Sequence, residues 1–207
     1  MEPDRGARDP RGASGQVSPH PRAPREEAAS GAITACVPPH RTRFAIGPVG
    51  RETIAPVTAF IRGRVPEDVE RCVDLWISAL RHRDGHVDEA PVSERTREVF
   101  GGGLIRFAIT DGPVLNGFAV TVPRTDETAV LERIAVRPSL AGQGIGRALL
   151  LDAITSSREG GYSALELAVR RGNPAVLLYE SLDFRRASEP IAHPLGGEPM
   201  ITYRLGL

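Results

Sequence analysis

The pattern of hydrophobic and polar positions divides the chain into two regions. Residues 1–50 are dense in Pro, Gly, Arg and Ala without hydrophobic periodicity, so they cannot bury enough apolar surface to offset their ordering entropy. We expect this stretch to be a disordered extension. From 57 to 207, apolar positions recur at strand and helix spacings, and this span is expected to form one domain that buries about two thirds of its unfolded surface. An isolated strand at 33–37 is left open.

Within 57–207 the periodicity predicts alternating strands and helices. A strand at 58–65 precedes a helix at 66–83 whose apolar residues share one face; they are Val69, Val73, Trp76, Ile77 and Leu80. Cys72 beside this stripe is interpreted as core packing. The remaining predicted elements are, in order, a short helix at 93–100, strands at 104–110, 115–122 and 128–136, a helix that stacks Ile145, Leu149 and Ala153, a strand at 163–169, a helix at 173–182, and strands near 184–190 and 200–205.

The segment 131–150 combines a strand end, a glycine loop and a helix start. A helix N-terminus leaves its first amides unpaired, and closely spaced glycines let backbone donors approach a phosphate. The loop is therefore a candidate pyrophosphate site. No GK[ST] follows it, and Arg147 breaks the G-x-G-x-x-G spacing, so neither ATP nor NAD is the expected ligand. Taken alone, the loop is equally compatible with a flexible turn.

A second segment, 173–184, changes this interpretation. The two segments together resemble the GNAT family of acetyl-CoA-dependent N-acetyltransferases, whose patterns are [QR]-x-x-G-x-[GA] after a strand ending V-x-P, and N-x-x-A-x-x-L-Y-E-x-x-G-F. The chain supplies Val136, Pro138, Gly144 and Gly146 for the first pattern, and Asn173, Leu178, Tyr179, Glu180 and Phe184 for the second. It departs from them at Ala141, which replaces Arg or Gln, at Ala175, which lies one position early, and at Asp183, which replaces Gly. Asp tolerates a left-handed backbone, so the turn before Phe184 is expected to survive.

The resemblance covers about residues 57–207 and implies an α/β (α+β), GNAT-like acyl-CoA N-acyltransferase fold. Its central sheet would be mixed, mostly antiparallel, with about six to seven strands flanked by about four helices. It also implies acetyl-CoA as co-substrate and direct attack of a primary amine on the thioester. The cofactor-binding positions that it implies are Ile134, Ala135, Val136, Ala141, Gly142, Gln143, Gly144, Ile145, Gly146, Arg147 and Asn173.

Two residues are candidates for proton transfer. A phenol with a pKa of about 10 can donate a proton to a thiolate whose conjugate acid has a pKa of about 8.5, so Tyr179 is the expected general acid. The alternative is a core aromatic on one helical face with Ala175 and Leu182. Glu132 is the candidate base, since deprotonating an alkylammonium at neutral pH costs about 4 kcal/mol. The alternative is that Glu132, beside Arg133, belongs only to a solvated or cross-strand-paired face of its strand.

Asn173 has two compatible interpretations. Because Pro174 follows it, Asn173 suits the N-cap of the next helix. The resemblance implies in addition that its side chain contacts the cofactor arm.

Composition excludes several classes of chemistry. All 26 basic residues are arginine, so a Schiff base, a lysine general base and lysine self-acetylation are ruled out. The net charge is zero with arginine scattered along the chain, so neither a nucleic-acid nor a membrane partner is expected. The two cysteines suggest no disulfide framework, which fits a reducing cytoplasm. No metal site is expected, because Gly85 separates His82 from His86 where the helix ends.

The acceptor amine is not identified by the sequence. Acidic residues at 84, 88, 89 and 94 are nearly balanced by arginines at 81, 83, 95 and 97, so small amines, amino acids, antibiotics and protein N-termini all stay open. His193 is interpreted as a surface histidine. A homodimer through the C-terminal strands is compatible with the sequence. The alternatives to an active enzyme are a catalytically silent acyl-CoA-binding sensor and a protein-interaction module.

Overall fold

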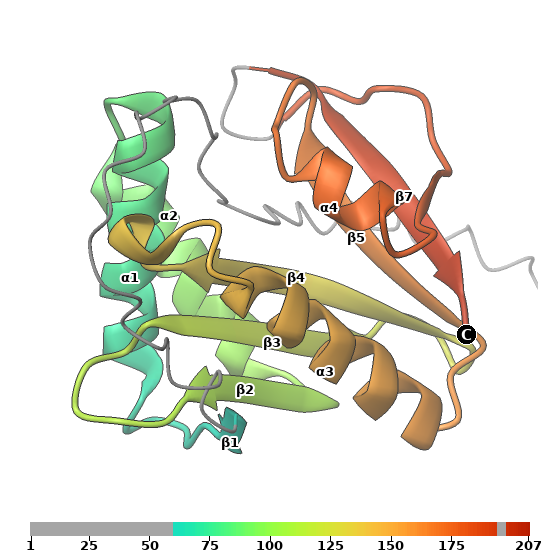
Figure 1. Ribbon diagram of the computed structural model, residues 1–207, viewed down its shortest axis with the longest axis horizontal. Helices are drawn as coiled ribbons and strands as arrows, with labels where there is room; N and C mark the ends of the chain where they lie inside the picture. The colour runs from blue at the N-terminus through green and yellow to red at the C-terminus, as the bar shows by residue number, and fades with distance from the viewer. Residues whose placement is uncertain (1–59, 194–197) are drawn as a thin grey trace, which may run out of the picture. The chain divides into compact units, whose positions relative to one another are not determined.

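The protein's structure, a computed structural model, describes residues 60–193 and 198–207 (Figure 1). The predictions for 1–50 and for a strand at 33–37 lie outside these residues. Of the two compact units of the chain, all described residues belong to Gly31–Leu207. The elements are β1 (Phe60–Arg62), α1 (Val69–Asp84), α2 (Glu89–Glu98), η1 (Val99–Gly101), β2 (Arg106–Thr110), β3 (Gly117–Pro123), β4 (Thr128–Val136), η2 (Pro138–Leu140), α3 (Ile145–Glu159), β5 (Ala164–Arg170), α4 (Val176–Glu180), β6 (Arg185–Arg186) and β7 (Met200–Gly206).

The described strands form one sheet in the order β1-β2-β3-β4-β5-β7-β6. All neighbours are antiparallel except β4 and β5, which are parallel. The predicted fold is therefore confirmed: the described ranges hold a mixed, mostly antiparallel sheet of seven strands with four α-helices.

Two apolar layers cover the two faces of the sheet. One layer packs α1 and α2 against β2–β4, and includes the predicted stripe of α1 with Cys72, all of it buried. The other layer packs α3 and α4 against β4, β5 and β7, and contains Ile145, Leu149 and Ala153. Gly117 of β3 permits close packing here, because a Cβ on it would lie 3.0 Å from Ile145 and 3.1 Å from Leu149. The start of α3 is thereby held against the sheet.

Three predicted helix bounds were wrong. The helix predicted at 66–83 begins at Val69, because Pro66–Asp68 form a turn in which the amide of Asp68 donates to the carbonyl of Arg64 (2.9 Å). The helix predicted at 93–100 begins at Glu89. Only Val92 and Thr96 of this helix are buried, so its sequence has little apolar periodicity to mark where it begins.

The helix predicted at 173–182 is the third, since α4 spans only Val176–Glu180. The residues before it form a tighter turn, in which the amide of Val176 donates to the carbonyl of Asn173 (3.1 Å), three residues back.

The parallel pair β4–β5 opens along its length. Only Thr128–Val130 pair with Ala164–Glu166, although β4 continues to Val136 and β5 to Arg170. Figure 1 shows the two strands diverging, β4 staying with β3 while β5 follows β7. We call the diverging part, Leu131–Val136 of β4 and Leu167–Arg170 of β5, the split. A split in a sheet leaves main-chain groups of its strands without ladder partners, so a ligand can form hydrogen bonds with them there.

Candidate functional site

The β4 side of the split presents main-chain groups of Ile134 and Val136. Just beyond β4, the amide of Arg137 donates to the carbonyl of Asn116, which precedes β3 (2.8 Å). Because antiparallel strands alternate between residues that bond to a given neighbour and residues that do not, Ala135 bonds toward β3, whereas Ile134 and Val136 direct their amides and carbonyls toward the split. Their side chains are buried against the α3 layer. The alternation thus leaves donors and acceptors along the split, where an extended ligand could pair with them.

The glycine loop lies between β4 and α3. Gly142 (φ 79°) and Gly144 (φ 84°) adopt the left-handed conformation, which lets the chain turn directly from η2 into α3 with Gly144 as its N-cap. Within the described part of the chain, no acceptor receives a hydrogen bond from the amides of Gly142, Gly144, Ile145, Gly146 or Arg147. Residues 142–144 are exposed. The loop therefore offers a group of accessible donors at the positive end of a 15-residue helix, which suits a phosphate.

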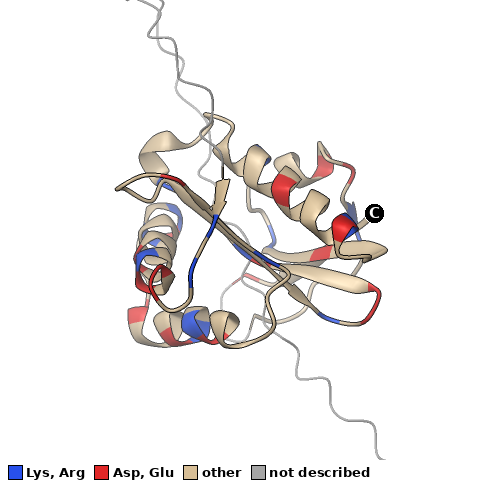
Figure 2. Cartoon of the chain, turned by 90° about the horizontal axis from the view of Figure 1, so that it is seen from below, with Lys and Arg blue, Asp and Glu red and all other residues tan. Residues whose placement is uncertain are grey.

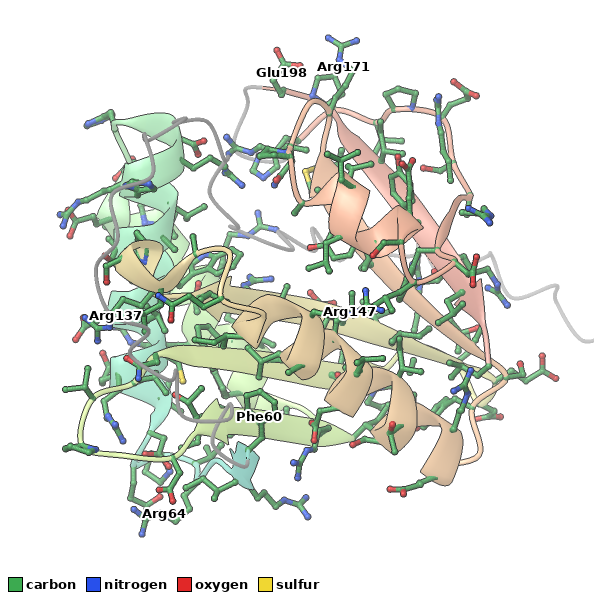
Figure 3. All side chains as sticks on the ribbon, in the orientation of Figure 1. Phe60, Arg64, Arg137, Arg147, Arg171 and Glu198 are labelled. Carbon is green, nitrogen blue, oxygen red and sulfur yellow. The ribbon has the colours of Figure 1, made fainter. Side chains whose placement is uncertain are left out.

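The side chains around the loop differ in whether they are free to bind a phosphate. Ala141 brings no polar side-chain group to the loop, and Gln143 is exposed. Arg137 is committed to the connection between β2 and β3, where its guanidinium donates to Asn116 Oδ1 (3.2 Å) and the carbonyl of Leu115 (2.9 Å). Arg147 is exposed and donates to Ser181 Oγ (3.1 Å), which follows α4. Figure 3 shows Arg137 beside α1 and Arg147 beside α3, so Arg147 is the arginine placed to supplement the loop.

Tyr179 lies on α4, in the apolar layer beneath it. Its ring is fully buried and packs edge-to-face on Phe184, with centroids 6.1 Å apart. Asp183 adopts the expected left-handed conformation (φ 66°), which returns the chain so that Phe184 reaches this layer. Asn173 is buried at the start of the segment, and its Oδ1 accepts from the amide of Ala175 (2.9 Å), which closes the turn leading into α4. The N-cap of α4 is Ala175, so the prediction that Asn173 is the N-cap of this helix was wrong.

Glu132 and Arg133 form a buried pair at the beginning of the split. Val120 of β3 opposes Arg133 and Thr121 opposes Leu131, so Glu132 is the extra residue of a β-bulge. Arg133 is 2% exposed and lies 5.4 Å from the centroid of the Trp76 ring. Its Nη1 approaches Glu132 Oε2 at 3.5 Å. Burial lowers the pKa of the Arg133 guanidinium to about 10, which remains far above neutral pH, so this guanidinium is a cation beside the Glu132 side chain.

A cluster at the end of α1 was missed by the sequence reading. The carboxylate of Asp84 accepts from Arg83 Nε (2.6 Å) and from Arg170 Nη1 of β5 (3.2 Å). Burial alone would raise the pKa of Asp84, but the hydrogen bond and charge of Arg83, with the charges of Arg170 and His193, hold it below its ordinary value. His193 is 5% exposed, so its interpretation as a surface histidine was wrong. Arg170 is 86 residues from Asp84, and no local pattern signals such a contact.

Charged side chains of both signs are mixed on the helices that cover one face of the sheet. Figure 2 shows acidic and basic positions interspersed on α1 and α2. Among residues 60–193 and 198–207 there is no group of three or more His, Cys, Asp or Glu side chains that could hold a metal ion. In the same residues, every helix is too short or too polar to cross a membrane.

Comparisons with known proteins identify relatives of this chain. Residues 69–184 match the model of the acetyltransferase (GNAT) family. The [ribosomal protein bS18]-alanine N-acetyltransferase of Escherichia coli K12 is 37% identical over 114 residues, which cover 54% of this chain and 76% of that protein. Its Haemophilus influenzae counterpart is 41% identical over 84 residues, covering 41% of this chain and 57% of that protein.

Solved structures show the same fold. The crystal structure of the ribosomal-protein-S18-alanine N-acetyltransferase from Escherichia coli superposes with a TM-score of 0.58 at 26% identity, covering 72% of this chain and 92% of that one. A GNAT family acetyltransferase from Elizabethkingia anophelis with acetyl-CoA bound gives a TM-score of 0.52 at 21% identity, covering 70% and 92%. This second likeness supports the fold alone.

Proposed function

The chain belongs to the GNAT family of acetyltransferases, and from this premise we propose that it acetylates the α-amine of a protein N-terminus with acetyl-CoA as donor. That it is an acetyltransferase follows from its family and its relatives. The single observation that carries the use of acetyl-CoA is the row of unpaired amides at the start of α3, next to the end of the split. The cytoplasm is the compartment we propose, since the relatives are named for a ribosomal protein.

The cofactor would lie along β4 with its phosphates on the glycine loop. The diphosphate takes the amides of Gly142, Gly144 and Gly146, and Arg147 adds a charged donor in place of the side chain missing at Ala141. The pantetheine arm, which carries amide groups, pairs with the main chain of Ile134 and Val136. Asn173, which lies just beyond the end of β5, contacts the arm from the other side of the split. The same main-chain donors polarise the thioester carbonyl as negative charge develops on its oxygen.

The chemistry requires two proton transfers. The neutral amine attacks the thioester carbonyl, a C–N bond forms, and the C–S bond breaks with its electron pair going to sulfur. Glu132 takes the proton from the amine, directly or through a water, and the Tyr179 hydroxyl gives a proton to the departing thiolate. The burial of Tyr179 suits a donor that is held rigidly, but it suits a core aromatic equally, so kinetics must separate the two.

The acceptor class is the finer part of the proposal. It rests on the relatives, which are named as alanine N-acetyltransferases of a ribosomal protein. The chain holds no lysine, so the acceptor is not a lysine of the enzyme itself. Small amines and antibiotics are the competing acceptors.

A peptide panel monitored by free thiol release tests this function. We expect release with hexapeptides that begin with Ala, and none with the same peptides carrying a blocked N-terminus, even when they contain an internal lysine. Turnover of polyamines or aminoglycosides without peptide turnover would contradict the acceptor class. Binding of acetyl-CoA without any turnover would support the silent sensor instead.

The third possibility, an interaction module without a cofactor, has its own test. A ligand present at about 100 times its dissociation constant stabilises the folded state by about 2.7 kcal/mol. We therefore expect acetyl-CoA to raise the unfolding temperature. An unchanged unfolding temperature at saturating acetyl-CoA would favour the interaction module.

A further inference from the structure

Arg133 is a buried cation, and its hydrogen bonds do not use all of its donors. Its Nη1 donates to the carbonyl of Glu132 (2.8 Å) and its Nη2 to the carbonyl of Arg95 in α2 (3.2 Å). Its Nε is buried and has no hydrogen-bond partner among the described residues. The guanidinium thus sits between α1, α2 and β4 with one of its donors unsatisfied.

Such an arrangement is costly for the fold. Removing a charge from water costs several kcal/mol, and one carboxylate at 3.5 Å with two carbonyls offsets this only in part. Apolar side chains of similar volume at both positions of a buried ion pair are often as stable or more so. Stability therefore gives no reason for a glutamate and an arginine at this point of β4.

The β-bulge explains how the two side chains meet. Regular alternation would send neighbours in a strand to opposite faces of the sheet. The extra residue at Glu132 breaks this alternation, and the side chains of Glu132 and Arg133 approach each other on the face covered by α1 and α2. The pair lies one residue beyond Leu131, where β4 and β5 have just parted. The bulge therefore brings a carboxylate and its cation to the mouth of the split.

We propose that Arg133 is a positioning residue that fixes the orientation of the Glu132 carboxyl group toward the acceptor amine. Its bond to the Arg95 carbonyl fixes the guanidinium to α2, and the Trp76 ring fixes it to α1, so the carboxylate is set relative to both helices. The inference rests on the base role of Glu132 in the proposed function. Arg133 itself does not touch the reacting atoms.

A double-mutant cycle tests this role on the full-length chain, with acetyl-CoA and an Ala-initiated hexapeptide. The variants are Glu132→Gln, Arg133→Met, the double variant, and Arg133→Lys, each checked for folding by circular dichroism at the assay temperature. We expect Arg133→Met to lower kcat about tenfold or more, with the KM for acetyl-CoA changed by less than about twofold. Arg133→Lys keeps a cation beside the carboxylate and should recover part of the loss.

The double variant gives the decisive readout. If Arg133 acts through Glu132, the double variant should be no slower than Glu132→Gln, within about twofold. Stability should behave differently: Arg133→Met leaves a carboxylate without its cation and lowers the unfolding midpoint, whereas the double variant should recover it. A purely structural role predicts a normal kcat for folded Arg133→Met.

Three results would overturn the inference. Multiplicative losses in the double variant would show that Arg133 acts independently of Glu132. An unchanged kcat for Glu132→Gln would remove the base that Arg133 is proposed to position, while leaving acetyl transfer itself intact. Absence of thiol release by the unsubstituted protein would overturn the proposed function and this inference with it.

Discussion

Tyr179→Phe separates the catalytic and structural interpretations of this residue. The substitution keeps the aromatic ring, which is fully buried and packed on Phe184, and deletes only the hydroxyl. Because the ring contacts survive, the free energy of unfolding should change by no more than about 1 kcal/mol. If the hydroxyl protonates the leaving thiolate, kcat should fall at least tenfold, which corresponds to about 1.4 kcal/mol in the activation barrier.

The assay is steady-state thiol release, with acetyl-CoA affinity measured in parallel by calorimetry. We expect the dissociation constant of acetyl-CoA to stay within about twofold, since the hydroxyl acts at the sulfur and not at the phosphates. Tyr203→Phe is the matched control, because Tyr203 of β7 belongs to the same apolar layer and loses the same group. Its turnover should be unchanged. Unchanged turnover of Tyr179→Phe would remove Tyr179 from the mechanism and leave it as a core aromatic.

Three further predictions follow from the loop and the α1 cluster. Gly144→Ala places an alanine in the left-handed conformation, so it should cost about 1 kcal/mol of stability and weaken acetyl-CoA binding as measured by calorimetry. The control Gly101→Ala should have neither effect. Full acetyl-CoA affinity in Gly144→Ala would contradict the assignment of the glycine loop to the phosphates. Arg147→Ala should weaken acetyl-CoA binding severalfold while Arg137→Ala leaves it unchanged, and the reverse order would show that the wrong arginine was chosen. The lowered pKa of Asp84 stabilises the fold above its ordinary value of 3.8, and this contribution is lost as pH falls through the folded-state pKa; chemical denaturation should therefore show Asp84→Asn less stable than the parent at pH 7, with the difference vanishing in acid.

Local stereochemistry made much of the site predictable. The bounds of β4 agree with the predicted run at 128–136, because Thr128 to Val136 are buried throughout and Pro138, two residues beyond the strand, begins a short 3-10 helix. The left-handed conformations of Gly144 and Asp183 follow from residue types that tolerate positive φ. The stripe of α1 follows from its period. In each case the cause lies within a few residues of the effect.

Contacts between distant segments were not predictable. His193 is buried, and its charge helps lower the pKa of Asp84 at the end of α1, which is far from it in sequence, so its own neighbours give no sign of this. The pairing of Glu132 with Arg133 across a bulge contradicts simple strand alternation, which assigns neighbours to opposite faces. The position of the bulge depends on β3, so it is invisible in β4 alone.

A crystal structure with bound coenzyme A tests the central claim most directly. The account predicts diphosphate oxygens within about 3 Å of the amide nitrogens of Gly142, Gly144 and Gly146, with the pantetheine arm in the split beside Ile134 and Val136. Coenzyme A bound elsewhere, or a glycine loop that stays empty at saturating ligand, would contradict it.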